Sequence, residues 1–351
     1  MYLRIIEQYP HMTILHHLAD NGVLWGTSRR DVYVRLDGKW QHRARFPFQL
    51  PRDLFAFSRP TTRIFRADKC NIYVNRYGNI LGIRAGQVYS IEANGTLQPL
   101  FRINGDCVLH ASICEDEEGN VYFGEYFMNP ERNAVRIWKV SANFAMWDVA
   151  YAFPAHSIRH VHGVFRDPYD EGAFWVAVGD FRGECFLLRT RDSFHTFDHF
   201  GDGTQIWRAV KLYFTREHVC WLTDSNLERN HACRMKRQTG ELEMGMDIAN
   251  SGWYGATTRE GLSIAFTTVE KGAGITSQLS EVLVSRDAFH WKSIYAFKKD
   301  CFRPMALFKY GVISCPSGCM SQKDFYISGE GLVGLDGKSM RLAILEDEKE
   351  E

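Results

Sequence analysis

Residues 284–297 read VSRDAFHWKSIYAF, and residues 140–153 read VSANFAMWDVAYAF. Both segments begin with Val-Ser, place a Trp six residues after the Ser, and end in Tyr-Ala-Phe. A third, weaker copy is RTRDSFHTFDHF at residues 189–200. Successive copies are 49 and 95 residues apart, counted from Ser141 to Thr190 and from Thr190 to Ser285. The second interval is about twice the first, so the spacings indicate an internal repeat of about 48 residues with one copy missing.

Turn signals recur at the same spacing elsewhere in the chain. Residues 36–40 (LDGKW) and 92–96 (EANGT) contain Asp-Gly and Asn-Gly, which favour tight β-hairpins, and residues 236–242 (KRQTGEL) form a polar turn. In the last repeat either residues 328–331 (SGEG) or Asp336-Gly337 fits, and the sequence does not choose between them. Alternating, β-rich runs such as VYVRL precede these turns, and no helical periodicity is sustained.

Four short strands in each of seven repeats predict an all-β protein, a seven-bladed β-propeller with four-stranded antiparallel blades. Residues 1–351 then form a single domain. Residues 1–8 would pair with the last blade and close the ring, which removes exposed sheet edges. The expected blades lie near residues 10–50, 58–101, 107–153, 159–200, 206–248, 252–298 and 302–345.

The repeated turn resembles the Asp-box, or BNR repeat, of the sialidase-like β-propellers. Two copies match best: Ser285, Asp287 and Trp291, and Thr190, Asp192, Thr196 and Phe197. Phe194 and Phe289 stand where that family has a central Gly. The third to fifth blades are also similar to bacterial BNR-repeat proteins described as glycosyl-hydrolase-like. The resemblance implies that the Asp caps a hairpin and that the aromatic residue packs between blades, so these boxes are structural.

Composition limits the partners. Lys+Arg and Asp+Glu both number 42, so the net charge is zero, which argues against a nucleic-acid partner. We find no apolar run near 18 residues and no secretory leader, and so expect a cytoplasmic protein without membrane insertion. Nine scattered cysteines without a CxxC motif favour reduced thiols, although Cys315 and Cys319 leave a disulfide or a soft-metal site open.

The geometry of a blade indicates where a site would lie. If the strands are lettered a to d from the axis outward, strand a begins on the face where strand b ends, and the Asp-box turn lies on the opposite face. The expected a-strand starts align a large polar residue in every blade: His16, Arg63, His110, His160, Arg208, Tyr254 and Arg303. The expected b-strand ends add three carboxylates: Glu125, Asp180 and Asp224. We predict that these groups surround one mouth of the channel and bind an anionic ligand such as a uronate or another acidic sugar.

The histidines are the sharpest chemical feature. His160 and His162 are two residues apart, so on one strand both side chains face the same side. His110 is expected at the matching level of the neighbouring blade. Three imidazoles could bind a divalent metal, Zn²⁺ or Mn²⁺, together with Glu125 or Asp180. Alternatively, the histidines only hydrogen-bond to neighbouring blades.

The same histidines could instead supply a general base for β-elimination from a uronate. Tyr126 or Tyr254 would then be the acid, and Arg208 would neutralise the substrate carboxylate. The aromatic residues Trp207 and Trp253 are candidates for stacking on sugar faces, with blade packing as the alternative.

A sialidase is favoured less. The Arg-Ile-Pro motif that the resemblance implies is missing, because Arg63-Ile64 is followed by Phe65. Arg63, Arg208 and Arg303 could still form an arginine triad, Glu125 and Tyr126 a nucleophile pair, and the three b-end carboxylates a hydrolytic pair.

The sequence therefore predicts a propeller that binds, and as a glycoside hydrolase or lyase would cleave, an acidic oligosaccharide at its axial mouth. The competing prediction is a non-catalytic propeller that binds a glycan or a protein partner. The sequence leaves open which of these applies and therefore whether the protein is an enzyme.

Overall fold

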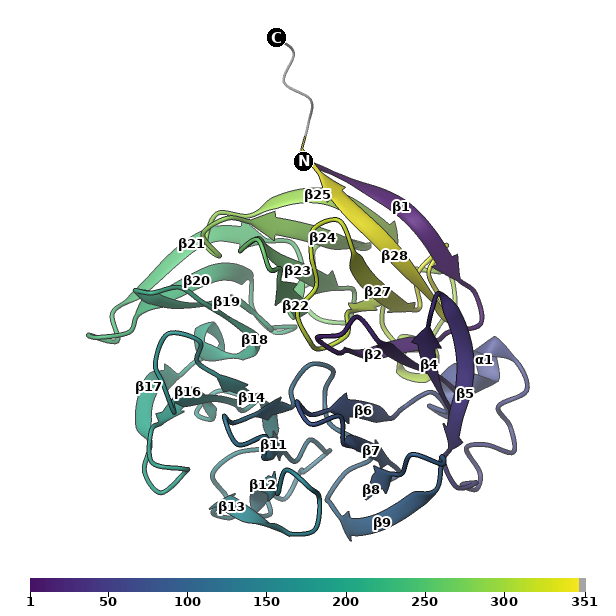
Figure 1. Cartoon of the computed structure of the whole chain (residues 1–351). Coiled ribbons are helices and arrows are strands. Elements are labelled where there is room, and N and C mark those ends of the chain that lie inside the picture. Colours follow the sequence, from purple (N-terminus) through teal and green to yellow (C-terminus); the bar gives the residue numbers. More distant parts are fainter. Residues whose placement is uncertain (347–351) are drawn as a thin grey trace.

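The computed structural model describes residues 1–346 and shows a seven-bladed β-propeller (Figure 1). Seven four-stranded antiparallel sheets surround one axis, and in six of them the strands follow chain order from the axis outward. The predicted all-β architecture is confirmed. In the described residues no helix combines the length and apolar character needed to cross a bilayer.

The strand bounds define the blades. Blade 1 contains β2 (Ile14–Leu18), β3 (Leu24–Ser28), β4 (Asp31–Leu36) and β5 (Lys39–Arg45), and blade 2 contains β6 (Asn71–Val74), β7 (Ile80–Arg84), β8 (Gln87–Ile91) and β9 (Leu97–Arg102). Blade 3 contains β10 (Cys114–Glu115), β11 (Val121–Gly124), β12 (Val135–Val140) and β13 (Trp147–Phe153). Blade 4 contains β14 (Val161–Arg166), β15 (Phe174–Val178), β16 (Cys185–Thr190) and β17 (Asp198–Gly203). Blade 5 contains β18 (Ala209–Phe214), β19 (His218–Thr223), β20 (Asn230–Lys236) and β21 (Leu242–Ile248). Blade 6 contains β22 (Ser251–Thr257), β23 (Ser263–Thr268), β24 (Leu279–Ser285) and β25 (Lys292–Lys298). Blade 7 contains β26 (Val312–Ser314), β27 (Phe325–Glu330), β28 (Lys338–Leu345) and β1 (Tyr2–Tyr9).

The repeated turns join the third and fourth strands of their blades. In blade 1, Asp37 and Gly38 both have positive φ, 48° and 77°, as a tight hairpin of the Asp-Gly type requires. In blade 6 the Asp287 carboxylate accepts backbone hydrogen bonds from Phe289 (3.0 Å) and His290 (2.8 Å). The carboxylate thus satisfies N–H groups that the turn leaves without a ladder partner.

The aromatic residue of the same turn packs between blades. Trp291 is buried, and its ring lies 5.1 Å from the ring of Tyr213 on β18 of the preceding blade. Phe194, at the position where the Asp-box family has Gly, has φ = 73° and is buried against Tyr122 and Phe174 of blades 3 and 4. Burial of a large ring offsets the backbone strain of a left-handed Phe.

The chain termini close the ring. Strand β1 pairs antiparallel with β28 and is the outermost strand of blade 7, so both ends of the chain build one sheet (Figure 1). Neither candidate turn of the last repeat joins third and fourth strands. Residues 328–331 lie at the end of β27, and Asp336-Gly337 lies between β27 and β28. That blade has no such hairpin, because the N-terminus supplies its fourth strand.

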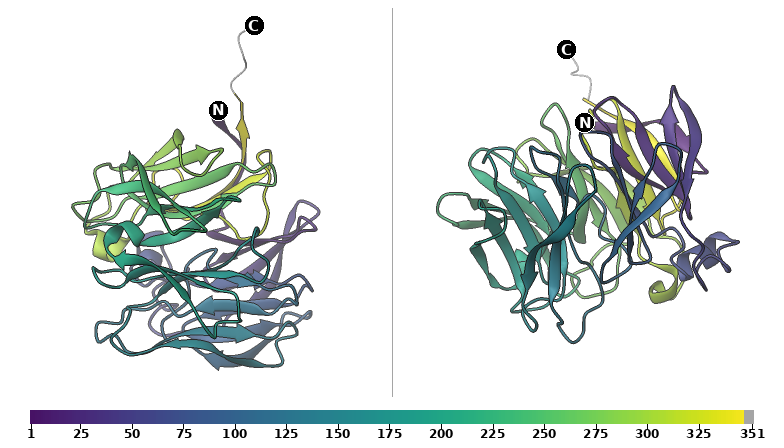
Figure 2. Two further views of the ribbon diagram at one scale, coloured as in Figure 1. Left: turned by 90° about the vertical axis from the view of Figure 1, so that its left-hand side faces the viewer. Right: turned by 60° about the horizontal axis from the view of Figure 1, so that its bottom comes forward.

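Within residues 1–346, three short helices interrupt the repeat between blades. They are α1 (Arg59–Ile64) before blade 2, the 3₁₀ helix η1 (Gln205–Trp207) before blade 5 and α2 (Met305–Phe308) before blade 7. Ser58 caps α1 in a reciprocal capping box with Thr61. Helices α1 and α2 lie against each other on the face where the inner strands begin (Figure 2). The segments that carry them lengthen two connections and shape the mouth of the channel.

Candidate binding site at the axial mouth

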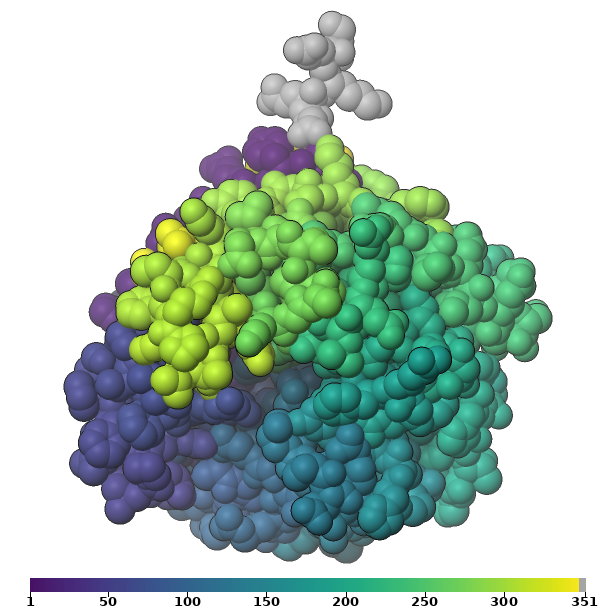
Figure 3. All heavy atoms as spheres, turned by 180° about the vertical axis from the view of Figure 1, so that it is seen from behind, coloured from purple at the N-terminus to yellow at the C-terminus, as the bar shows by residue number. Residues whose placement is uncertain are grey.

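A cavity of about 210 Å³ opens where the inner strands begin. We call it the axial cavity, and it is lined by Thr13, Ile14, Arg59, Arg66, Asp68, Lys69, Cys70, Cys107, Val108, Leu109, His110, Tyr126, Trp253, Tyr254, Lys309, Tyr310, Val312, Ser314, Ser328, Gly329 and Glu330. Figure 3 shows this face hollowed near its centre, beside the yellow-green segment that contains α2. The site therefore lies opposite the Asp-box turns, on the face that blade geometry predicts.

Unpaired cations gather in this cavity. Within residues 1–346, Arg66, Lys69 and Lys309 form no ion pair or hydrogen bond through their side chains. The fourth cation is neutralised, because Arg59 pairs with Asp68 at 2.5 Å and with Asp336 at 2.9 Å. Three unpaired positive side chains converging on one recess produce a field that attracts an anion.

The electrostatics of Lys309 and Glu330 are coupled across the cavity. Burial, reinforced by Arg66, lowers the pKa of Lys309 to about 7, although Glu330 opposes the shift. Burial also raises the pKa of Glu330, against the influence of Arg59 and Lys309. A bound anion would favour the protonated, charged form of Lys309.

Aromatic rings form the opposite wall. The ring of Trp253 makes edge contacts with Tyr254 (6.1 Å) and Tyr310 (5.9 Å), and Tyr254 contacts His110 at 5.5 Å. Burial, followed by the charge of Lys69, lowers the pKa of His110 to about 4, so this imidazole is neutral at pH 7. Burial raises the pKa values of Tyr126 and Tyr254, so both phenols stay protonated.

A buried polar network stands behind the aromatic wall. The Trp253 indole N–H donates to Asp224 at 2.6 Å, and Arg208 bridges Asp224 (3.2 Å) to Asp180 (3.0 Å). Burial raises the pKa of Asp224 to about 7; Arg208 opposes this shift and Glu270 reinforces it. The network fixes Trp253 in the cavity wall through hydrogen bonds across blades 4, 5 and 6.

The network ends at two histidines. The Nε2 atoms of His160 and His162 lie 3.1 Å apart and contact the Asp180 carboxylate at 3.3 and 3.1 Å. Although burial opposes its ionisation, the positive charge of Arg208 contributes to holding the pKa of Asp180 well below its usual range. Tyr126, a cavity residue, lies with its ring 4.2 Å from His160.

The structure separates His110 from this cluster. Among the described residues, the group whose ligand atoms lie close enough to share a metal ion is His160, His162 and Asp180. His110 instead lines the axial cavity, between His16 (5.6 Å) and Tyr254. His110 lies in the segment before the short strand β10, outside the group formed by the other two histidines and Asp180.

Two arginines of the predicted ring do not line the axial cavity. Arg63 lies in α1, is 1% exposed, and pairs with Asp300 while donating to the Phe308 carbonyl. Arg303 is exposed just before α2 and hydrogen-bonds to Gln278. Because α1 and α2 are insertions between blades, a constant period of about 48 residues misplaces both positions. No triad of Arg63, Arg208 and Arg303 forms.

Three further predicted residues lie outside the axial cavity. The Glu125 carboxylate accepts hydrogen bonds from Asn104 and Arg136 backbone N–H groups at 2.9 and 3.1 Å. Trp207 stacks on Trp221 within the apolar core at 5.4 Å. His16 is buried with its Nε2 2.8 Å from the Thr27 hydroxyl.

The cations that line the cavity, Arg66, Lys69 and Lys309, are absent from the ring of residues predicted from the sequence. Arg66 and Lys69 immediately precede β6, and Lys309 precedes β26, so they hold the positions in blades 2 and 7 that we assigned to Arg63 and Arg303. A local signal was available, since each group lies just before an apolar run, NIYV or GVIS. An alignment of the blades on these apolar runs, instead of on a fixed period, places the three cations at the starts of the inner strands.

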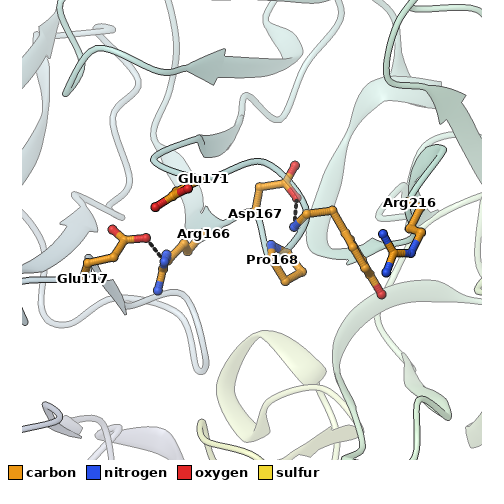
Figure 4. A pocket seen from close by; sticks show the side chains of 7 residues that line it. Glu117, Arg166, Asp167, Pro168, Glu171 and Arg216 are labelled. Atoms are coloured by element: carbon orange, nitrogen blue, oxygen red, sulfur yellow. Dashed lines mark hydrogen bonds and ion pairs between the residues drawn. The ribbon is translucent and has the colours of Figure 1, made fainter.

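Two larger recesses lie on the opposite face. One of about 800 Å³ borders the turn between β14 and β15, where Glu117 pairs with Arg166 and the Asp167 carboxylate accepts from the Tyr169 N–H (Figure 4). Residues 167–172 (DPYDEG) form the hairpin turn between these two strands. The other, which we call the distal groove, measures about 1020 Å³ and is lined by residues of blades 1 to 4 and by Ser317–Cys319 of blade 7. In the recess of about 800 Å³, Glu117, Arg166 and Asp167 all have charged partners.

Comparison with known proteins supports the fold. Neither a protein-family model nor a curated protein matches the chain, so the Asp-box assignment stays a prediction.

Among solved structures, YCF48 bound to D1 peptide aligns with a TM-score of 0.53 and 10% identity over 98% of this chain and 94% of that chain. Raptor from Chaetomium thermophilum aligns with a TM-score of 0.58 and 11% identity, and an extracellular domain from B. thetaiotaomicron with 0.54 and 11%. Each of these two alignments covers 99% of this chain. They cover 29% of the Raptor chain and 40% of the B. thetaiotaomicron chain. At such identities the similarity shows one thing: the chain has a β-propeller fold.

Proposed function

We propose that the protein binds a small acidic carbohydrate, of the size of a single uronate, in the axial cavity. The observation that carries this proposal is the convergence of three unpaired cations, Arg66, Lys69 and Lys309, with aromatic rings on one recess. Charged hydrogen bonds recognise a carboxylate, and aromatic faces stack on the apolar face of a sugar ring. The volume of about 210 Å³ is below the ~300–1,000 Å³ typical of drug-sized sites, which favours a single sugar unit.

Isothermal titration calorimetry tests the proposal with matched sugars. Glucuronate and galacturonate should bind, whereas glucose and galactose, which lack the carboxylate, should not. Lys69→Met should weaken glucuronate binding about tenfold, the effect of losing one charge-assisted contact worth about 1.4 kcal/mol. Lys323→Met is the matched control, because Lys323 is exposed and does not line the cavity. Equal affinity for glucuronate and glucose would contradict the proposal.

Elimination from a bound uronate is a chemical extension of this proposal. Neutral His110 is able to remove the proton from C5, and protonated Tyr126 or Tyr254 is able to donate a proton to the oxygen that leaves C4. Arg66 or Lys69 would neutralise the carboxylate in place of Arg208, which is already paired. Incubation with oligogalacturonate should then produce the ultraviolet absorbance of an unsaturated sugar; binding without this absorbance would indicate a non-catalytic propeller.

Hydrolysis has less support. Asp180 and Asp224 share Arg208 behind the wall, and Glu125 is occupied by backbone N–H groups, so none of the three carboxylates lines the cavity. Paired carboxylates must flank the bond that they cleave.

Peptide binding in the distal groove is a second candidate function. It is favoured by the size of the groove, about 1020 Å³, and by the likeness to YCF48, which was solved with a bound peptide. Peptides selected by display against the wild-type protein should lose binding when Tyr73, which lines the groove, is changed to Ala. Selected peptides that bind Tyr73→Ala equally would contradict this candidate.

We also propose a reducing compartment such as the cytoplasm. All nine cysteines are free, including the separately placed Cys315 and Cys319, and most are buried. Thiols of this kind are typical of proteins that stay reduced.

A further inference from the structure

The hydrogen bonds of His160 and His162 determine which ring nitrogen carries a proton. The Nδ1 atom of His160 lies 3.0 Å from the Phe127 carbonyl oxygen, and that of His162 lies 2.8 Å from the Ala209 carbonyl oxygen. A carbonyl oxygen only accepts, so each Nδ1 must donate its N–H. In the neutral imidazoles both Nε2 atoms then present lone pairs.

These lone pairs point at one another and at a carboxylate. The two Nε2 atoms are 3.1 Å apart, and the Asp180 oxygens lie 3.1 Å and 3.3 Å from them. Without an intervening proton or cation, three acceptors would meet at hydrogen-bond distance in a site where His160 and His162 are each 2% exposed and Asp180 is 7% exposed. Buried acceptors facing each other repel, and a positive centre between them removes that cost.

The spacing matches the coordination sphere of a transition metal. A tetrahedral Zn²⁺ bound at about 2.0–2.2 Å holds its ligand atoms about 3.3–3.6 Å apart. The two Nε2 atoms lie 3.1 Å apart, close to this spacing, and each contacts a different Asp180 oxygen, so that one ligand atom from each residue lies within 4.8 Å of the others. Asp180 retains acceptor capacity, because Arg159 (2.7 Å) and Arg208 (3.0 Å) each take one oxygen and a carboxylate offers about four lone-pair sites. The backbone carbonyls at Nδ1 are the outer partners that metal-bound histidines usually have.

We propose that His160, His162 and Asp180 form a zinc site behind the wall of the axial cavity. The imidazole-rich ligand set favours Zn²⁺ over Mn²⁺. The Nδ1 contacts come from Phe127, which follows β11 of blade 3, and from Ala209, which begins β18 of blade 5, so the ion and its histidines would connect blades 3, 4 and 5. Three protein ligands leave one position for water, on a site that contacts Tyr126 of the cavity.

Zinc analysis of the full-length protein tests this assignment. Protein stripped with a chelator should take up one Zn²⁺ per chain, measured by elemental analysis after gel filtration, and Co²⁺ in its place should give the visible absorption of a tetrahedral site. His162→Gln and Asp180→Asn should each weaken Zn²⁺ binding at least about 100-fold, because even outer-sphere partners cost 10–100-fold. His17→Gln should bind zinc as the wild type does, since His17 is buried but contacts Ser317 instead.

The wild-type protein decides the outcome without relying on the folding of a variant. Failure of the stripped protein to bind Zn²⁺ or Co²⁺ at micromolar concentrations would overturn the proposal and mean that a shared proton separates the acceptors. Undiminished zinc binding by His162→Gln and Asp180→Asn, with near-ultraviolet circular dichroism like the wild type, would place the metal elsewhere and also overturn it. Neither result depends on whether the axial cavity binds a sugar.

Discussion

At the scale of the residue, the axial cavity depends on a few charges whose partners are missing. Arg66 is exposed and Lys69 is half-buried, whereas the pKa of Lys309 is lowered to about 7, so the charge of Lys309 varies near neutral pH. Its ammonium group is disfavoured by burial and by neighbouring cations. Ligand binding should therefore depend on pH through Lys309 and through the coupled Glu330 carboxyl, whose ionisation at higher pH also opposes the binding of an anion.

We expect the affinity for glucuronate to fall as pH rises from 6 to 8.5. Lys309 has a pKa of about 7 in the free protein, so it loses its charge across this range. Lys309→Met should bind about tenfold more weakly at pH 6 and show a shallower pH dependence than the wild type, the remainder coming from Glu330. Calorimetry at several pH values measures both effects; a variant with the wild-type slope would exclude Lys309 as the titrating group.

A second residue-scale prediction concerns stability. The pKa of Asp224 is raised to about 7 in the folded protein, against 3.8 for the unfolded chain, so between these values the folded state binds more protons. The free energy of unfolding contributed by Asp224 is therefore largest at low pH and falls as pH rises from about 4 to about 7. Asp224→Asn keeps an acceptor for Trp253 but cannot titrate.

Urea unfolding at pH 5, 6.5 and 8 checks the sign. The wild-type protein should lose stability relative to Asp224→Asn as the pH increases, and the difference should level off above pH 7. A difference that stays constant or changes in the opposite direction would show that Asp224 is ionised throughout this range.

At the scale of the element, the hairpins have a structural task that is separate from the site. Their Asp or Asn side chains satisfy turn N–H groups, as Asn143 does for Ala145 at 3.1 Å. The periodic turns could be predicted from the sequence because turn chemistry is local. The helices α1 and α2 could not be placed in this way, since each occurs once and breaks the period.

Removal of one turn carboxylate should lower stability without affecting the ligand. Asp287→Ala loses two backbone hydrogen bonds and should cost about 1–2 kcal/mol in the free energy of unfolding. Asp148→Ala, an exposed change on β13, is the control and should stay within about 0.5 kcal/mol. Denaturant unfolding gives both values. Weaker glucuronate binding by a folded Asp287→Ala protein would contradict the assignment of the site to the other face.

At the scale of the whole molecule, stability depends on closing the ring. Strand β1 covers the edge of β28 along most of its length, from the pair Tyr2–Leu345 to the pair Tyr9–Ser339. Without β1 this edge would expose unpaired backbone groups and the side chains of Leu342 and Ile344 to solvent.

Deletion of residues 1–9 should therefore open the propeller. We expect the melting temperature to fall by more than about 5 °C and the protein to form oligomers through the exposed edge. Size-exclusion chromatography and calorimetry measure these changes. Ile6→Ser changes a residue on the same strand that is 41% exposed, so this variant should keep the melting temperature and the elution volume of the wild-type protein. A truncated chain with wild-type behaviour would show that ring closure contributes little.

By itself, the sequence determined the repeat, the seven blades, the hairpin residues and the face on which to look, because strand alternation and turn chemistry are properties of neighbouring residues. It also identified His110, Tyr126, Trp253 and Tyr254, which line the cavity. Only the tertiary structure decided which cations are unpaired and that Arg63 forms an ion pair with Asp300. It also decided that Asp180, and not His110, lies close enough to His160 and His162 to share a metal ion. The reason is physical: a charge is available to a ligand only when no partner from another blade reaches it, and that pairing depends on insertions whose position no local pattern encodes.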